Sequence, residues 1–473
     1  MSDKDLKEKK LIKNTFWFAV GTLLSKVIMF LIVPFYTAIL TTEEYGIADI
    51  ISTSVSLAFP FFSLIITEAV MRFLLDKKGN EKDIFNFGFR IIFVGTIALV
   101  LISFPIFWFI PQIKDYWIYF ILFYLFSSIS TLESEFLKGQ EKVKTLSIVN
   151  ITYTIVFLGS NLLFLLTFKM AIKGYLLSFI VANLFSSILY FFAGKLYKYY
   201  SISKIEDNDL KKSMLKYSFP MIPNSAMWWI TNSSDRYMVS FIISASATGI
   251  LSIAYKIPSM LSIAIGVFMG AWQISVVDDF DNEKGKTFFK ETYNKYNESL
   301  LIIAATLVVA SKLLGKILYS ADFFQAWKLS SILVIAFLFH SLAGFLGTVY
   351  TTVKKTRILF YSTLAGAVIN LALNFLLINF WGVEGAVIAT FASYFTTYLI
   401  RRLTIRKYIE IGKIRIRILL SYTSLFSCGI LMYLDTCITI IIASALMVSI
   451  YALNYRFFIS LIERLKKLIK RNK

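Results

Sequence analysis

Three basic residues lie inside stretches of the chain that are otherwise apolar: Lys26, Arg236 and Lys256. Arg236 belongs to the segment MWWITNSSDRYMVSFII (227–243), where Asp235 precedes it directly. A basic side chain at the centre of a membrane helix costs about 2.5–3.5 kcal/mol, so three of them require a compensating environment. Asp235 supplies one opposite charge. We interpret the three cations as the lining of a water-filled cavity that suits an anion.

Each cation also has a purely structural interpretation. The ammonium of Lys26 could extend to the membrane surface, although the distance from mid-span is long. Arg236 could form an ion pair with Asp235 that only holds helices together, and Lys256 could pair with the carboxylate of Asp49. The polar residues expected to support the predicted cavity are Asp235, Asn232 and Asp49.

The composition is that of a membrane protein. Of the 473 residues, 57% are hydrophobic and 16% are charged, against roughly 25% charged in ordinary soluble domains. The single histidine and the two cysteines exclude a histidine-clustered metal site and a disulfide framework. We therefore predict an all-α, polytopic membrane protein without a metal or a cofactor. The net charge of +20 is attributed to cytoplasmic loops and not to a nucleic-acid partner.

Apolar runs of about 20 residues are long enough to cross a hydrocarbon core of roughly 30 Å. Of the 49 lysines and arginines, 40 fall on the side of the termini and 6 on the other. This asymmetry predicts that both termini and the loop 195–216 are cytoplasmic. The outer loops are short, which argues against an enzyme. The fourteen predicted spans are 12–36, 46–70, 86–110, 116–137, 146–168, 172–194, 217–243, 247–275, 296–320, 329–352, 358–379, 385–405, 416–434 and 438–458.

The chain contains a weak internal repeat. LIKNTF (11–16) aligns with MLKYSF (214–219), and YGIADI (45–50) aligns with TGILSI (248–253), at the same offset. An even number of spans per copy gives both copies the same orientation, with the substrate site expected between the two halves. The predicted parts are a six-helix lobe at 1–194, a cytoplasmic linker at 195–216, a second six-helix lobe at 217–407, and two extra helices with a basic tail at 408–473.

Two stretches resemble the polysaccharide-transporter (Wzx-type) flippases of the multidrug/oligosaccharidyl-lipid/polysaccharide exporter superfamily. They are LIKNTFWFAVGTLLSKVIMFLIVPFYTAILTTEEYG and YSFPMIPNSAMWWITNSSDRYMVSFIISASATGILSIAYK. The resemblance implies a V-shaped, two-lobed bundle that works by alternating access. It also implies a cationic central cavity, to which Lys26, Arg236 and Lys256 correspond.

The implied function is to flip an undecaprenyl-diphosphate-linked oligosaccharide from the inner to the outer leaflet of the bacterial cytoplasmic membrane, for capsule, O-antigen or exopolysaccharide assembly. Expected partners are this lipid-linked substrate and the bilayer, with a polysaccharide polymerase and glycosyltransferases as further candidates. Three alternatives stay open: a peptidoglycan lipid II flippase, a cation-coupled multidrug exporter of the same superfamily, and a membrane glycosyltransferase or polymerase. The sequence does not identify the glycan, the coupling ion, the oligomeric state or the role of the last two helices.

Overall fold

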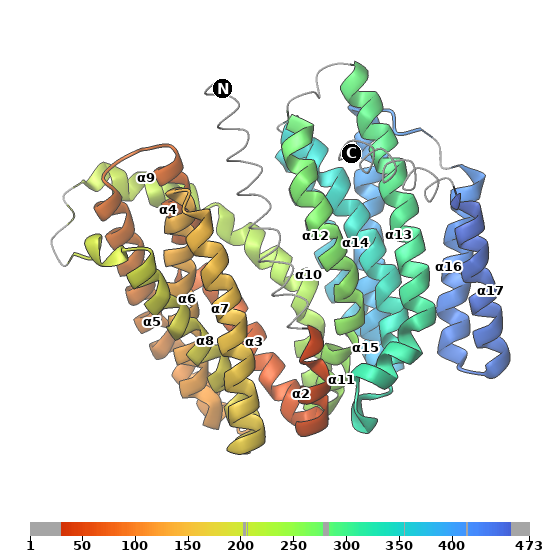
Figure 1. Cartoon of the computed structure of the whole chain (residues 1–473), viewed down its shortest axis with the longest axis horizontal. Helices are drawn as coiled ribbons and strands as arrows, with labels where there is room; N and C mark the ends of the chain where they lie inside the picture. The colour runs from red at the N-terminus through yellow and green to blue at the C-terminus, as the bar shows by residue number, and fades with distance from the viewer. Residues whose placement is uncertain are drawn as a thin grey trace, which may run out of the picture. The chain divides into compact units, whose positions relative to one another are not determined.

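The computed structural model describes residues 30–201, 205, 207–277, 283–353, 355–412 and 415–455. Every regular element in these ranges is helical, which confirms the predicted all-α fold (Figure 1). The chain groups into two compact units, one ending at Trp229 and the other beginning at Ile230. This division falls inside helix α10 (Met221–Ile242). The predicted boundaries of the lobes and of the linker stay predictions.

The first unit is a bundle in which α6 packs against α4, α5 and α8, and α7 packs against α8. Its longest helix, α5, contains one proline and is mostly apolar from Ile91 onward. The helices of this unit are α2 (Val33–Ile39), α3 (Thr42–Phe62), α4 (Ile66–Leu75), α5 (Glu81–Phe109), α6 (Trp117–Gly139), α7 (Val143–Leu162), α8 (Ala171–Ala193) and α9 (Asn208–Ser218).

The predicted span 46–70 is broken between α3 and α4. Leu64 and Ile65 adopt left-handed backbone conformations, with φ of 51° and 50°, which side chains with a Cβ adopt at an energetic cost. Helix α5 approaches closely beside this break, because a Cβ on Gly95 would lie 1.7 Å from the carbonyl oxygen of Phe62. The break therefore depends on a glycine in the neighbouring helix.

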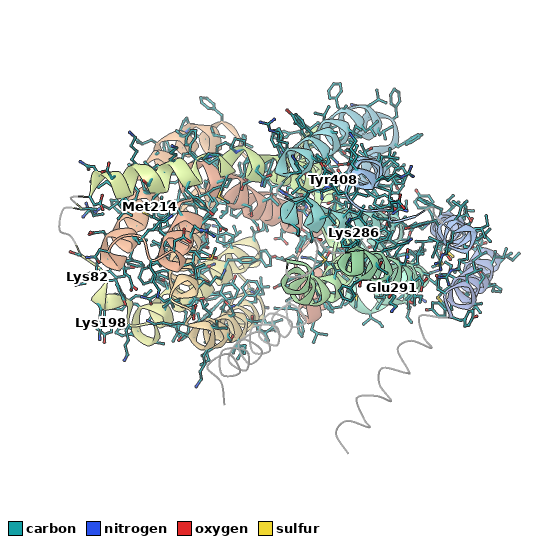
Figure 2. All side chains as sticks on the ribbon, turned by 90° about the horizontal axis from the view of Figure 1, so that it is seen from above. Lys82, Lys198, Met214, Lys286, Glu291 and Tyr408 are labelled. Atoms are coloured by element: carbon teal, nitrogen blue, oxygen red, sulfur yellow. The ribbon has the colours of Figure 1, made fainter. Side chains whose placement is uncertain are left out.

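Three loops predicted to share one side of the membrane meet at one end of the first unit. Gln140 donates hydrogen bonds to Glu81 Oε2 at 2.6 Å and to the hydroxyl of Tyr199 at 2.8 Å. Asn86 donates to the backbone oxygen of Tyr199 at 2.7 Å. Figure 2, which views the molecule from above, shows Lys82 and other residues of these loops at this end. These three loops therefore lie at the same end of the first unit, as the predicted alternation requires.

The second unit is arranged around α14, which packs against α11, α12, α13, α15 and α16. Of its most apolar 18 residues, 78% are buried, against 33% for α5 in the first unit. Figure 1 shows α16 and α17 side by side at the edge of this unit. Besides the end of α10, its helices are α11 (Ala245–Ala254), α12 (Lys256–Val277), α13 (Glu283–Leu318), α14 (Ala326–Thr352), α15 (Thr356–Thr404), α16 (Ile416–Leu434) and α17 (Cys437–Leu453).

Helix α15 consists of two helices that meet at a kink. Gly382 has φ of 61° and ψ of −136°, a conformation that glycine adopts without steric cost. The two arms fold back on each other, because Ser393 Oγ donates to the backbone oxygen of Gly366 at 2.8 Å. They correspond to the two separate spans predicted at 358–379 and 385–405.

Nine helical segments of the described ranges are long and apolar enough to cross a membrane. Helix α17 is apolar but has only 17 residues. Large apolar side chains are exposed on α5, with Phe109 81% and Leu101 70% exposed, as expected of a surface that faces lipid. The chain is a multi-pass membrane protein. The predicted first span, 12–36, lies mostly outside the described residues.

Candidate functional site

The carboxylate of Asp235 is buried inside the second unit, on α10, with 2% of the residue exposed. Its Oδ2 accepts a hydrogen bond from the hydroxyl of Tyr255, and its Oδ1 accepts one from the backbone N–H of Arg236 at 2.9 Å. A buried carboxylate without such donors would carry a large desolvation cost. Both oxygens of Asp235 are thus solvated by neutral donors.

Tyr255 reaches Asp235 because it lies at the junction of two helices. Helix α11 ends at Ala254 and α12 begins at Lys256. Pro258 has no N–H, so it leaves the carbonyl of Ala254 without its usual helical donor. Ser330 on α14 supplies the missing hydrogen bond to that carbonyl at 2.8 Å. The proline therefore interrupts the helix next to Tyr255, and a side chain of the neighbouring helix α14 supplies the hydrogen bond that the interruption removes.

Tyr255 also contacts the cation of the pair. The guanidinium carbon of Arg236 lies 4.9 Å from the centre of the Tyr255 ring, a distance at which a cation is attracted to an aromatic face. The Tyr255 hydroxyl lies 3.3 Å from Thr390 Oγ1. One tyrosine thus orients the carboxylate through its hydroxyl and the guanidinium through its ring.

The network extends along α10 to the two arms of α15. Tyr394 donates to Asn232 Oδ1 at 2.7 Å, and its ring lies 4.5 Å from the ring of His340. Ser234 donates to Asn370 Oδ1 at 3.1 Å. We use the name Asp235 network for the polar residues of this part of α10 and their partners on α15 and at the α11–α12 junction. They are Asn232, Ser234, Asp235, Arg236, Tyr255, Asn370, Thr390 and Tyr394.

The structure brings only some of the predicted site residues together. Arg236 is half-buried in the Asp235 network, and Lys256, also half-buried, follows Tyr255 directly at the start of α12. Asp49 is half-buried on α3 of the first unit. Lys26 lies outside the described residues. The pairing of Lys256 with Asp49 and the convergence of all three cations stay predictions.

Several residues of the network have no role that the sequence alone predicts. Tyr255 was part of the second family motif, but nothing in its spacing indicated a contact with Asp235. Asn370 and Asn374 do carry a usable signal, since they are one helical turn apart in an apolar span. Their side chains are hydrogen-bonded at 3.0 Å and are 1% and 0% exposed.

The chemistry of this arrangement suits the binding of an anion. No group of three or more histidine, cysteine, aspartate or glutamate residues in the described part of the chain could hold a metal ion. Asp235 is engaged by hydrogen-bond donors, whereas Arg236 and Lys256 bring two positive charges. Guanidinium and ammonium groups both bind phosphate.

Comparison with known proteins places the chain in a family. The profile of the family described as polysaccharide biosynthesis protein matches residues 11–273. An uncharacterized membrane protein of Methanocaldococcus jannaschii is 26% identical over 418 residues, which cover 82% of this chain and 96% of that protein.

Several solved transporter structures share the fold. The lipid II flippase MurJ in an inward closed conformation has a TM-score of 0.67 at 17% identity, covering 93% of this chain and 99% of its own. An inward-facing multidrug resistance MATE family transporter of the MOP superfamily has a TM-score of 0.66 at 10% identity, covering 81% and 95%. A Vibrio cholerae MATE transporter, VcmN, has a TM-score of 0.58 at 14% identity, covering 84% and 98%. The chain therefore belongs to the polysaccharide biosynthesis protein family and has the fold of the multidrug/oligosaccharidyl-lipid/polysaccharide exporter superfamily, as its resemblance to Wzx-type flippases predicted.

Proposed function

We propose that this protein flips an undecaprenyl-diphosphate-linked oligosaccharide from the inner to the outer leaflet of the bacterial cytoplasmic membrane by alternating access. Membership of the polysaccharide biosynthesis family supports the substrate class. The observation that carries the proposal is the position of Arg236, over the ring of the tyrosine that also binds Asp235. In the proposal, Arg236 and Lys256 bind the pyrophosphate, and Lys26 adds a third charge.

Moving a polar, anionic headgroup across a membrane explains why the protein retains basic residues whose burial in a membrane is unfavourable. The glycan and pyrophosphate cannot cross lipid unaided, because their polar groups would lose their hydrogen bonds to water. A polar, cationic cavity replaces those hydrogen bonds while the polyprenyl tail stays in the bilayer. Outward movement of an anion from a cell that is negative inside is favoured by about 2.3 kcal/mol per charge per 100 mV. The membrane potential therefore drives transport in the proposed direction.

A lipid II flippase is the second candidate, because the fold likeness to MurJ covers nearly the whole chain. Lipid II also carries a pyrophosphate, so the same cations would serve. A multidrug exporter shares the fold as well. Organic cations, however, require carboxylates that are available to them, and the hydrogen bonds of Asp235 engage its carboxylate. We further propose that the protein is not an enzyme and that any polymerase or glycosyltransferase is a separate partner.

The test is transport by the purified protein in liposomes. An undecaprenyl-diphosphate-linked oligosaccharide is placed in both leaflets, and a membrane-impermeant glycosidase is added outside. We expect the glycosidase to digest the whole pool when the protein is present and only the outer-leaflet fraction when it is absent. Lipid II and a cationic dye are run as competing substrates. Faster movement of either one than of the oligosaccharide would favour the corresponding alternative.

We also propose that both termini and the loop 195–216 are cytoplasmic. Cys437 is exposed and Cys428 is buried, so the chain contains its own reporter for the predicted outer loop between α16 and α17. An impermeant maleimide should label Cys437 in intact cells. In a Cys437→Ser background, Ser213→Cys on the exposed surface of α9 should be labelled only after lysis. The reverse pattern would invert the topology.

A further inference from the structure

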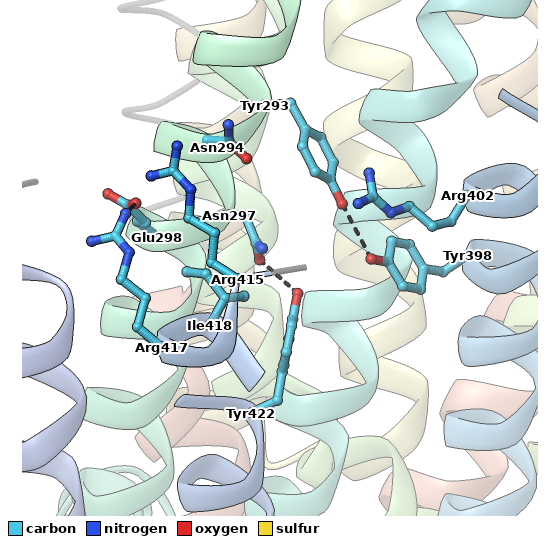
Figure 3. Close-up of a pocket in the computed structure, with 10 residues that line it drawn as sticks. All are labelled: Tyr293, Asn294, Asn297, Glu298, Tyr398, Arg402, Arg415, Arg417, Ile418 and Tyr422. Carbon is cyan, nitrogen blue, oxygen red and sulfur yellow. Dashed lines mark hydrogen bonds and ion pairs between the residues drawn. The ribbon is translucent and has the colours of Figure 1, made fainter. Parts of the chain in front are cut away.

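A pocket in the second unit lies where α13, the end of α15 and the start of α16 meet (Figure 3), and none of its lining residues belongs to the Asp235 network. Its lining includes three arginines, Arg402, Arg415 and Arg417, but only one carboxylate, Glu298. Arg417 is paired with Glu298. This pair leaves two positive charges at the pocket without a carboxylate among its lining residues.

Of the two arginines without a carboxylate partner at the pocket, Arg402 is the buried one. The residue is 7% exposed, and its guanidinium carbon lies 5.3 Å from the centre of the Tyr293 ring. Its Nη2 donates to the backbone oxygen of Gly412 at 2.8 Å. Its Nη1 is buried and has no hydrogen-bond partner among the described residues. A buried charged donor without an acceptor is costly, because it has lost water without gaining a replacement.

Figure 3 shows Arg402 on one side of the pocket, and Arg415 and Arg417 on the other. Arg415 is exposed and precedes the first residue of α16, where its side chain makes no capping hydrogen bond. The start of a helix adds partial positive charge, since its first N–H groups have no acceptors within the helix. The basic side chains and this helix end thus surround one space, which suits an anion with several oxygens.

The neighbouring surface indicates what carries the anion. Ile416, Leu419 and Leu420 follow Arg415 on α16 and are 70%, 49% and 47% exposed. In a multi-pass membrane protein, exposed aliphatic side chains on a spanning helix face acyl chains. The pocket therefore adjoins a lipid-facing surface at the end of a span, at the level where phospholipid headgroups lie.

We propose that this pocket binds a phosphate group, held by Arg402 and Arg415, and that its source is the headgroup of an anionic phospholipid. The site adds a structural lipid to the protein and is independent of the transported substrate. A water molecule could satisfy Nη1 of Arg402 but would not balance its charge. A phosphodiester does both.

The test measures binding to the purified full-length protein in a neutral detergent. Phosphatidylglycerol, phosphatidylcholine and inorganic phosphate are titrated separately, and retained lipid is counted by native mass spectrometry. We expect phosphatidylglycerol to bind and phosphatidylcholine, which has no net charge, to bind at least about tenfold more weakly. Arg402→Gln should weaken phosphatidylglycerol binding by about tenfold or more, the range for loss of a charged hydrogen bond. Lys316→Gln removes an exposed cation from α13 and should have no effect.

Arg415→Gln keeps the experiment decisive should Arg402→Gln fail to fold, because Arg415 is exposed and its loss should weaken binding without unfolding the bundle. Unchanged phosphatidylglycerol binding in both arginine variants would overturn the proposal. Equal binding of phosphatidylglycerol and phosphatidylcholine by the native protein would overturn it as well. Tight binding of inorganic phosphate without any lipid preference would support the phosphate site and refute its lipid source. None of these readouts depends on flipping, so they separate this site from the proposed function.

Discussion

Buried tyrosines have different roles in the two units. In the first unit, Tyr36, Tyr45 and Tyr175 form an aromatic cluster, with ring centres of Tyr36 and Tyr175 4.9 Å apart. The hydroxyl of Tyr36 is buried without a hydrogen-bond partner among the described residues. In the second unit, Tyr255 and Tyr394 direct their hydroxyls to Asp235 and Asn232.

The Tyr36 cluster thus packs helices together, whereas Tyr255 solvates a buried charge, as Tyr200 does for Glu133 elsewhere in the first unit. A tyrosine ring contributes apolar area in either place, but only a hydroxyl with a partner contributes polarity. The position of the Asp235 network makes the second unit the better candidate for binding the charged part of a substrate. The contribution of Lys26 from the first unit stays a prediction.

The largest expected effect is on transport. The double change Arg236→Gln with Lys256→Gln should lower the rate of glycan flipping by about 10- to 100-fold, since charged hydrogen bonds to phosphate are lost. The flipping rate is expressed per folded molecule, because loss of Arg236 leaves the buried carboxylate of Asp235 without its neighbouring positive charge and should lower membrane abundance. The liposome assay and quantitative immunoblotting measure the two quantities. Lys316→Gln is the matched control. Normal flipping by the double variant would assign both residues a structural role.

A pair of matched substitutions tests the comparison of the tyrosines directly. Tyr255→Phe should lower the free energy of unfolding by about 1–3 kcal/mol, because it removes a donor from a buried carboxylate. Tyr36→Phe should change it by less than about 0.5 kcal/mol, because no hydrogen bond is lost. Denaturant unfolding in detergent provides both values. A larger decrease in the free energy of unfolding for Tyr36→Phe than for Tyr255→Phe would contradict the different roles assigned to the two tyrosines.

The smallest expected effect concerns the helix breaks. At the break between α3 and α4, the stabilising hydrogen bond is local: Ser63 Oγ accepts from the N–H of Ile65 at 3.2 Å. Ser330 repairs the break of the second unit from another helix, through the carbonyl of Ala254. Ser330→Ala should cost about 0.5–1.5 kcal/mol of stability. Ser330→Ala should also lower the flipping rate per folded molecule, because the interruption of the helix at this point positions Tyr255. Ser63→Ala should cost a similar amount without changing the activity per folded molecule.

Much of the fold could be predicted from the sequence, since apolar runs and polar breaks mark the spans and their alternation. The two arms of α15 were separated correctly, because Gly382 lies in a recognisable interruption. The breaks at Ile65 and Tyr255 could not be predicted, because each depends on a partner helix: α5 approaches the first through Gly95, and Ser330 repairs the second. Local sequence does not contain these contacts.

Charge counting predicts which loops are cytoplasmic, but it does not predict the roles of individual residues. The charge count assigns Arg401 to a cytoplasmic loop, yet it is 4% exposed and donates to Ser362 Oγ, the backbone oxygen of Ala343 and Thr363 Oγ1, at 2.8–3.0 Å. A basic residue at the end of a span thus serves packing as well as orientation. The Asp-Arg pair was recognised as unusual because it lies in an apolar run. Its solvation by Tyr255 required the tertiary structure.

The proposed function depends on recognition of the substrate's pyrophosphate by Arg236 and Lys256. The most direct measurement is the dissociation constant of an undecaprenyl-diphosphate-linked oligosaccharide for the native protein and for the Arg236→Gln, Lys256→Gln double variant in the same detergent. The corresponding undecaprenyl monophosphate serves as the reference ligand. We predict that the native protein binds the diphosphate at least about tenfold more tightly than the double variant does, with a smaller difference for the monophosphate. Equal dissociation constants of the diphosphate for the two proteins would contradict the claim.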